Sequence, residues 1–296
     1  CELLTGVYDI PAAMTRGRAV TSNTSPTTPY RSAGRPEAMF IIERLVNIAA
    51  HKHGFDPIEL RRRNLIPREK TPYEQSLGLT YDVCDFPYAM ETALQMSDWE
   101  GFPERREEAR NRGLRRGIGL ANYLEITSGT PIERAEISVL PEGRVEVVIG
   151  TSPSGQGHET SFAQCVSEWL GVAFNSIRII TGDTERVKEG GGSHSARSMR
   201  MAGIVMGKAS DIVIEKGRRI AEHILETTAS DIDFIAGQYT VKGTDRTIDI
   251  FEVAKFSMNN AVLSDDLRGI LSGEHQELMQ VPGYPYGAQV CEVEID

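Results

Sequence analysis

A strand that runs through a glycine-rich loop into a helix most constrains how this chain can fold. Residues 147–149 are apolar and β-branched, residues 150–160 are rich in glycine and serine, and an amphipathic helix follows at once. Backbone N–H groups in such a turn can approach a ligand closely, and the helix dipole favours an anion there. The pattern therefore indicates a phosphate-bearing ligand, with an ordinary tight turn around Gly155 and Gly157 as the alternative interpretation.

A second glycine-rich segment lies further along the chain and leads into another helix. Residues 190–192 are three consecutive glycines, and residues 193–198 contain three serines, a histidine and an arginine. Three glycines in a row cost backbone entropy, so they indicate a loop that needs positive φ or close approach to a neighbour. The hydroxyls and Arg197 suit a diphosphate, and a mobile surface loop is the alternative interpretation.

Local patterns predict an α+β fold in which mixed sheets pack against helices. Residues 1–114 are expected to form a connecting segment, irregular as far as residue 30, and a helical part. Residues 115–296 are expected to form an α+β part that carries both glycine-rich loops. Helices are predicted to begin near residues 38, 57, 88, 104, 161, 199 and 250. Strands are predicted at residues 118–124, 135–140, 144–149, 176–180, 234–241 and 289–295.

Two expectations concern burial in the N-terminal part. The helix that follows residue 37 is expected to be buried through its apolar residues at helical spacing, which are Ile41, Ile42, Leu45, Val46, Ile48 and Ala49. The short helix that Asp56 and Pro57 begin carries Arg61, Arg62 and Arg63. A solvated face is the expected setting for these arginines, in preference to a nucleic-acid patch.

Composition and charge narrow the class of protein. The 296 residues carry a formal net charge of −10, and no basic stripe is large enough to follow a phosphate backbone, so nucleic acid is not an expected partner. No run of about 18 apolar residues occurs, so no membrane span is expected. The cysteines are far apart and lack the spacing of a zinc or iron–sulfur site. Reduced thiols in a cytoplasmic protein are therefore expected.

Several motifs occur in an order and spacing that resemble one family. They are residues 30–38 (Tyr-Arg-Ser-Ala-Gly-Arg-Pro-Glu-Ala), 56–66, 155–160 (Gly-Gln-Gly-His-Glu-Thr), 182–198 and 287–296. These motifs extend nearly from end to end and resemble the large, molybdenum-binding subunit of the molybdenum hydroxylases. That oxidoreductase family includes xanthine dehydrogenase, aldehyde oxidase and aldehyde oxidoreductase, and the aerobic carbon monoxide dehydrogenase large chain.

The resemblance implies a molybdopterin cofactor, in bacteria usually its cytosine dinucleotide form. The pterin dithiolene holds the molybdenum in this family, so no protein side chain is expected to ligate the metal. One loop is expected near the pterin and metal, namely Gly155, Gln156, Gly157 and His158. The other is expected to hold the pterin or the dinucleotide phosphate, namely Gly191, Gly192, Ser193, His194, Ser195, Arg197 and Ser198. Arg31 and Ser32 are expected in the loop that faces the substrate.

The resemblance also implies a reaction, in which a carbon centre of an aldehyde, purine or other N-heterocycle is hydroxylated with oxygen from water. Electrons are expected to leave through partner subunits that carry 2Fe-2S clusters and FAD. The chain begins at Cys1 and ends within a strand pattern at Asp296, so we expect a piece of a longer protein. The family's catalytic glutamate follows that last strand, so the chain alone is expected to be inactive and to contain no molybdenum.

Other interpretations stay open beside this one. The chain could be a non-catalytic domain that binds a cofactor or sister subunits, which a Gly-x-Gly-Glu motif downstream of Asp296 would argue against. It could also be a carbon monoxide dehydrogenase-like large chain that lacks the copper-ligating cysteine. Ser32 stands at the position of that cysteine, and a hydroxyl is a poor ligand for Cu(I), so carbon monoxide is not the expected substrate. His158 could be a catalytic base, since an unperturbed imidazole titrates near neutrality, but the resemblance favours a role in the cofactor loop.

Overall fold

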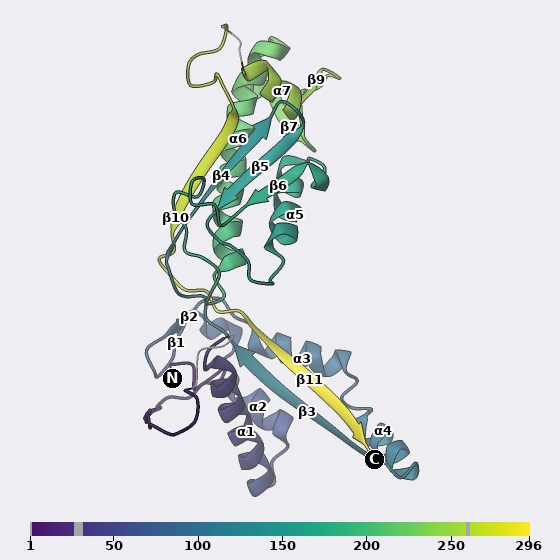
Figure 1. The fold of residues 1–296 in the computed structure, drawn as a ribbon. Helices are drawn as coiled ribbons and strands as arrows, with labels where there is room; N and C mark the ends of the chain where they lie inside the picture. The colour runs from purple at the N-terminus through teal and green to yellow at the C-terminus, as the bar shows by residue number, and fades with distance from the viewer. Residues whose placement is uncertain (1, 27–31, 259–260) are drawn as a thin grey trace. The chain divides into compact units, whose positions relative to one another are not determined.

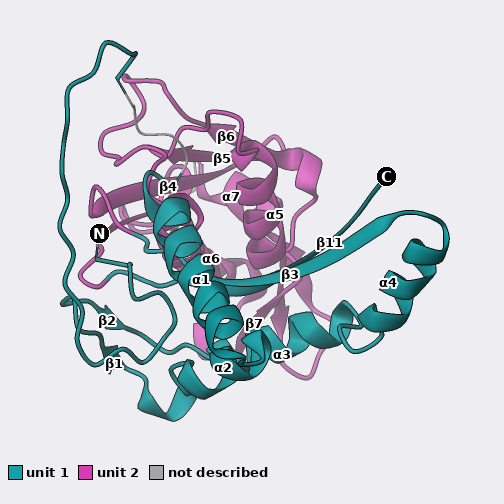
Figure 2. Cartoon of the chain, turned by 90° about the horizontal axis from the view of Figure 1, so that it is seen from below, with its two compact units in different colours: residues 1–127, 282–296 teal, residues 128–281 magenta. Residues whose placement is uncertain are grey.

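A computed structural model of the chain describes residues 2–26, 32–258 and 261–296 (Figure 1). They form two compact units, Cys1–Thr127 with Pro282–Asp296 and Ser128–Val281 (Figure 2). The units do not coincide with the predicted division at residue 114, because the chain leaves the first unit after Thr127 and returns to it at Pro282. No helix among the described residues is long and apolar enough to cross a membrane.

In its described residues, the first unit is built on two long paired strands and four helices. Its elements are α1 (Arg35–His53), α2 (Pro57–Asn64), a 3-10 turn (Arg68–Lys70), β1 (Tyr73–Glu74), β2 (Thr80–Tyr81), α3 (Phe86–Met96), α4 (Phe102–Asn111), β3 (Arg115–Leu124) and β11 (Tyr286–Ile295). β3 and β11 are antiparallel along their full length. This pairing joins segments far apart in the sequence, and it explains why the first unit extends past residue 114.

The helix starts and stops in this unit confirm the capping signals. The Asp56 carboxylate accepts hydrogen bonds from the N–H groups of Ile58 and Glu59 at 2.9 and 2.8 Å, and Pro57 is the first residue of α2. Gly54 ends α1 in the left-handed conformation, and its N–H donates to the Ala50 carbonyl. Such local signals act within one turn, so they do not depend on tertiary packing.

Burial in the first unit differs from the prediction. α1 leaves Ile41, Leu45 and Ile48 exposed, whereas Ile42 and Val46 are partly buried against the core as predicted. The fully buried residues of α1 are Ala38, Met39, Glu43 and Ala50. Helical spacing marks an apolar stripe but does not say which neighbouring face meets the core. The N-terminal segment is also more than a connection, because Leu3, Val7 and Tyr8 lie in the core of the unit.

Arg61 corrects the prediction of a solvated arginine cluster. Its side chain is 1% exposed, and it forms an ion pair with Glu43, whose Oε2 accepts from Arg61 Nη2 at 2.8 Å and from Nε at 2.9 Å. The Tyr8 hydroxyl donates to the other Glu43 oxygen, and burial together with that carboxylate raises the pKa of Tyr8. Arg62 and Arg63 do lie on the surface, where they pair with glutamates.

The second unit contains a four-stranded sheet. Its elements are β4 (Ile132–Leu140), β5 (Arg144–Ile149), α5 (His158–Leu170), β6 (Ile177–Ile180), α6 (Ser198–Leu225), β7 (Ile232–Ile235), β8 (Gln238–Val241), β9 (Thr247–Asp249), α7 (Ile250–Ser257), β10 (Leu271–Leu278) and 3-10 turns at Phe174–Ser176 and Ala229–Asp231. The strand order is β10-β4-β5-β6, with only β5 and β6 parallel. α5 provides the crossover that a parallel pair requires.

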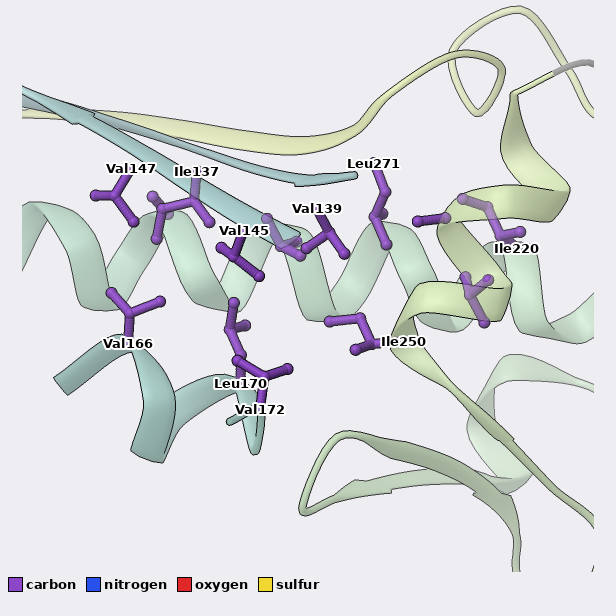
Figure 3. Packing of buried hydrophobic residues seen from close by; sticks show 14 of the residues in the cluster. Ile137, Val139, Val145, Val147, Val166, Leu170, Val172, Ile220, Ile250 and Leu271 are labelled. Carbon is purple, nitrogen blue, oxygen red and sulfur yellow. The ribbon is translucent and has the colours of Figure 1, made fainter. Parts of the chain in front are cut away.

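Apolar side chains from the sheet and helices form the core of this unit. Figure 3 shows Ile137, Val139, Val145 and Val147 from β4 and β5 above α6, with Val166 from α5 on the other side of that helix. The β4–β5 hairpin, α5 and α6 confirm the predicted elements. This core anchors the ends of β5 and the start of α6, from which the two glycine-rich loops extend.

Some features of the second unit were predicted wrongly or not at all, among them the short strand β9. Residues 234–241 form part of a hairpin, β7 and β8, rather than one strand, because Ala236 and Gly237 both take positive φ, +49° and +80°. β10 was not predicted, since its sequence from Leu271 to Leu278 is mostly polar. An edge strand has only one hydrogen-bonded neighbour and can carry such a sequence.

Candidate functional site

The two glycine-rich loops of the second unit meet backbone to backbone. A Cβ atom on Gly150 would lie 2.3 Å from the Gly190 Cα, and one on Gly190 would lie 2.4 Å from the Gly150 Cα. A Cβ on Gly191 would lie 2.6 Å from Cζ of Arg197. Gly192 has a φ of +71°, which disfavours a side chain. A side chain is therefore disfavoured at each of the three consecutive glycines, for a different steric reason at each. This agrees with the expectation drawn from their cost in backbone entropy.

A buried ion pair lies at this crossing. Arg197 and Glu133 are both 0% exposed, and Arg197 Nη1 donates to Glu133 Oε2 at 2.9 Å. Other Arg197 N–H groups donate to the carbonyls of Thr130 and Ile132 at 2.8 Å and of Gly192 at 2.6 Å. The guanidinium is thus engaged inside the protein, and direct contact of Arg197 with a phosphate stays a prediction that would require these bonds to open.

The Glu133 carboxylate binds both glycine-rich loops. Its Oε1 accepts from the Gly150 N–H, and its Oε2 accepts from the Gly191 N–H, each at 3.2 Å. The Thr151 hydroxyl adds a third hydrogen bond to Oε2, at 2.6 Å. The sequence missed Glu133 because it stands in an ordinary strand, two residues before the predicted start at 135, and only the fold places it between the loops.

The first loop leaves its tip open. Gln156 is exposed, and its side-chain oxygen accepts a hydrogen bond from the Ser154 N–H. Gly155 and Gly157 have φ values of +100° and +74°, and a Cβ on either would meet no described atom within 4 Å. No described side chain caps the start of α5. Backbone and Gln156 groups at the tip are thus accessible to a ligand.

His158 points into the protein, as the first residue of α5. The residue is 5% exposed, and its ring stacks on that of Phe162 with centroids 4.6 Å apart. Nδ1 has no hydrogen-bond partner among the described residues. Burial lowers the pKa of His158, and the nearby Thr151 backbone opposes that shift only in part. A neutral, packed imidazole fits a loop residue better than a catalytic base.

The buried imidazole predicts a loss of stability in acid. The unfolded chain takes up a proton on His158 near pH 6.5, whereas burial holds the folded pKa lower. Stability conferred above the unfolded pKa is therefore lost as the pH falls from about 6.5 towards the folded pKa. Calorimetry between about pH 7.5 and about pH 5 should show a larger drop in Tm for the wild type than for His158→Gln. Equal drops in Tm for the wild type and His158→Gln would contradict a lowered pKa of His158 in the folded protein.

The second loop holds most of its polar groups in local hydrogen bonds. The hydroxyls of Ser193 and Ser198 lie 2.6 Å apart, and α6 begins at Ser198. His194 is exposed, with Nε2 3.0 Å from the Gly191 carbonyl and Nδ1 3.1 Å from the Ser195 hydroxyl. The exposed His194 ring is therefore the polar side chain of this loop that is most accessible to a ligand.

The expected substrate loop belongs to the first unit. Arg31 lies outside the described residues. The Ser32 hydroxyl donates to Glu125, and Arg35 Nε lies 3.0 Å from the same carboxylate. Ser32 and Gly34 have φ values of +66° and +89°. Ser32, Arg35 and Glu125 border a groove of about 810 Å³. Its apolar lining includes Met39, Phe40, Leu120 and Leu124. Sequence reasoning did not bring Glu125 to this loop.

The residues at the tip of the first loop fit the expected molybdopterin. Such a group presents ring nitrogen and oxygen atoms and a phosphate, which need donors and acceptors at close range. The Gln156 amide, the two open glycines and the uncapped start of α5 offer these. Among the described residues, no cluster of three His, Cys, Asp or Glu side chains could hold a metal ion. Metal binding through the pterin stays a prediction.

Known proteins resemble this chain over its whole length. Models of the molybdopterin cofactor-binding domain match residues 92–296 and 1–65. The gamma subunit of the 6-hydroxypseudooxynicotine dehydrogenase complex of Paenarthrobacter nicotinovorans is 33% identical over 98% of the chain. The carbon monoxide dehydrogenase large chain of Hydrogenophaga pseudoflava is 30% identical over all of it.

Solved structures agree with these relatives. Quinoline 2-oxidoreductase from Pseudomonas putida 86 matches with a TM-score of 0.85 and 29% identity over 100% of the chain. Carbon monoxide dehydrogenase from Oligotropha carboxidovorans also gives 0.85, with 30% identity over 99%. The chain spans 37% and 39% of the two curated relatives' length, and 39% of each of these structures. The chain belongs to the molybdopterin cofactor-binding domain family and corresponds to part of the molybdenum hydroxylase large subunit.

Proposed function

We propose that this chain is the cofactor-binding part of an enzyme that hydroxylates a carbon centre with oxygen from water. The observation that carries the proposal is the pair of crossed glycine-rich loops, whose outer tip keeps Gln156 and two glycines open. A bound molybdopterin would supply the redox chemistry. The Gln156 amide and the N–H groups that begin α5 would bind and orient its pterin end. Backbone groups at Gly191 and Gly192, with Ser193, His194, Ser195 and Ser198, would hold a phosphate.

The substrate class follows from the relatives and from Ser32. Among the relatives are a nicotine 6-hydroxylase and a quinoline 2-oxidoreductase, both named for N-heterocycles. Ser32 offers a hydroxyl that already donates to Glu125, and such a group is a poor ligand for Cu(I). An N-heterocycle, purine or aldehyde is thus a better proposal than carbon monoxide.

The proposal includes partners that remove electrons. One relative is named as the gamma subunit of a complex, and others are named as large subunits or large chains. Partner subunits with 2Fe-2S clusters and FAD would accept the electrons, and the cofactor would be the cytosine dinucleotide form. The cysteines that the structure describes are free thiols, which fits a cytoplasmic location.

Cofactor analysis of the natural complex tests this function. The complex that contains this chain is denatured, and molybdenum, the pterin dinucleotide, flavin and iron are measured per mole of chain. The expected result is molybdenum and the pterin in equal amounts. An active, well-folded complex that releases neither would refute the proposal and favour a different cofactor.

Gln156→Ala should lower the activity of the complex far more than its stability. Loss of a side chain that orients the reacting group typically lowers kcat about 10²-fold. The Gln156 side chain is exposed and makes only a local hydrogen bond. The free energy of unfolding should therefore change by less than about 0.5 kcal/mol. The turnover of N-heterocycles, purines and aldehydes and the stability in urea are measured for the wild-type complex and for Gln156→Ala. A parallel loss of both would make Gln156 a structural residue.

A further inference from the structure

One carboxylate in the second unit, that of Glu133, receives hydrogen bonds from the N–H of its neighbour Arg134 and from four residues of the two glycine-rich loops. Gly150 and Thr151 come from the end of β5, whereas Gly191 and Arg197 come from the segment before α6. Glu133 itself stands on β4, next to β5 in the sheet. The carboxylate therefore joins both loops to the rigid sheet at a single point.

This arrangement is costly unless every donor stays in place. A fully buried carboxylate loses its hydration, and only an opposite charge and several hydrogen bonds offset that loss. Arg197 supplies the charge, and it donates to the Gly192 carbonyl as well. A shift of either loop would break bonds to the buried charge, so the positions of the two loops are energetically linked.

The first loop runs from Thr151 to the start of α5. Thr151 donates through its hydroxyl to Glu133, and the buried His158 ring stacks on Phe162. His158 is the first residue of α5 and follows Gln156 by two positions. The segment that carries Gln156 is thus held at its beginning by Glu133 and at its end by the packing of His158 on Phe162.

We propose that Glu133, through Thr151 and Arg197, is a positioning residue that sets the separation of the two cofactor loops and thereby the retention of the pterin. Glu133 does not contact the ligand itself, because its side chain is fully buried where the two loops meet at Gly150 and Gly190. The inference rests on the proposed function, since it assumes that both loops contact one molybdopterin. It predicts an effect on cofactor retention that exceeds any effect on folding.

Thr151→Val is the decisive variant. Valine fills the same space and leaves the Arg197 charge and both glycine N–H bonds on Glu133, but it removes the side-chain link to the first loop. Glu133→Gln is the stronger change, because it removes the charge opposite Arg197. Glu43→Gln is the matched control, since Glu43 also pairs with a buried arginine, Arg61, in the other unit.

The test uses the natural complex carrying each variant. Released pterin and molybdenum are followed over time after dilution, and Tm is measured on the same samples. We expect Thr151→Val to release the cofactor faster by about tenfold, which corresponds to the loss of one hydrogen bond to a charged group, with a fall in Tm no larger than that of Glu43→Gln. Glu43→Gln should lower Tm while the release rate per folded chain stays at the wild-type value.

The outcomes separate this inference from the function on which it rests. A wild-type complex without pterin would overturn both. A wild type that carries pterin, together with Thr151→Val that releases it at the wild-type rate, would overturn only the positioning role. Equal acceleration in Glu43→Gln and Thr151→Val would also overturn it, because general destabilisation would then explain the release. If Glu133→Gln does not fold, the rate of cofactor release from Thr151→Val still tests the positioning role.

Discussion

Gly190→Ala should force the two glycine-rich loops apart. The added methyl group would lie 2.4 Å from the Gly150 Cα, 3.1 Å from its carbonyl carbon and 3.2 Å from a Glu133 oxygen. Backbone atoms cannot turn aside as a flexible side chain can, so the crossing itself must open. Overpacking of this kind costs up to about 3 kcal/mol and occasionally more. The weakened hydrogen bonds to Glu133 would add to that loss.

Gly192→Ala is the matched control for this prediction. Gly192 lies two residues away with a φ of +71°, and a Cβ there would meet no described atom within 4 Å. Its substitution should cost only the left-handed conformation, about 1–2 kcal/mol. Urea unfolding of both variants, with the pterin content of the complex, gives the comparison. If the two variants lost the same stability, the backbone crossing would not be the reason for the glycine at position 190.

Arg61→Ala should destabilise the first unit by about 3–5 kcal/mol, the cost of leaving a buried charge without its partner. Glu43 is 5% exposed and would keep only the Tyr8 hydroxyl as a side-chain donor among the described residues. Arg61 also donates to the Pro57 carbonyl at 3.0 Å, so the substitution frees the start of α2 as well. Chemical denaturation monitored by tryptophan fluorescence measures the loss, since Trp99 packs against the core of this unit.

Arg63→Ala controls for the loss of a guanidinium from the same helix. Its side chain is 74% exposed, and it pairs with Glu59 on the surface of α2. Exposed pairs of this type contribute about 0.3–0.5 kcal/mol. A similar loss of stability in Arg61→Ala and Arg63→Ala would show that the buried pair with Glu43 contributes little beyond a surface one.

Most elements of the fold were predictable because their signals are local. The Asp56 cap, the Gly54 and Gly171 helix ends and the turn between β4 and β5 depend on residues within one turn of each other. Pairing partners were not predictable in the same way. Alternation in residues 289–295 indicated a strand, but nothing in it named β3 as the neighbour.

The residues of the candidate site also differ in whether the sequence alone could predict them. Glycines, serines and Gln156 marked both loops, because glycine spacing at a helix start is visible in the sequence alone. Glu133 and Glu125 were missed, since a glutamate in a strand looks the same whether it faces solvent or binds a loop. His158 and Arg197 were noticed for their chemistry, and the structure places both side chains inside the protein.

The sequence by itself determined the family, the order of the elements and the presence of two glycine-rich loops. The tertiary structure decided which charges are buried, where Glu43 pairs with Arg61 and Glu133 with Arg197, and that the loops touch at Gly150 and Gly190. The physical reason is range. Backbone preferences and caps act between near neighbours, whereas the environment of a carboxylate depends on every segment that packs around it.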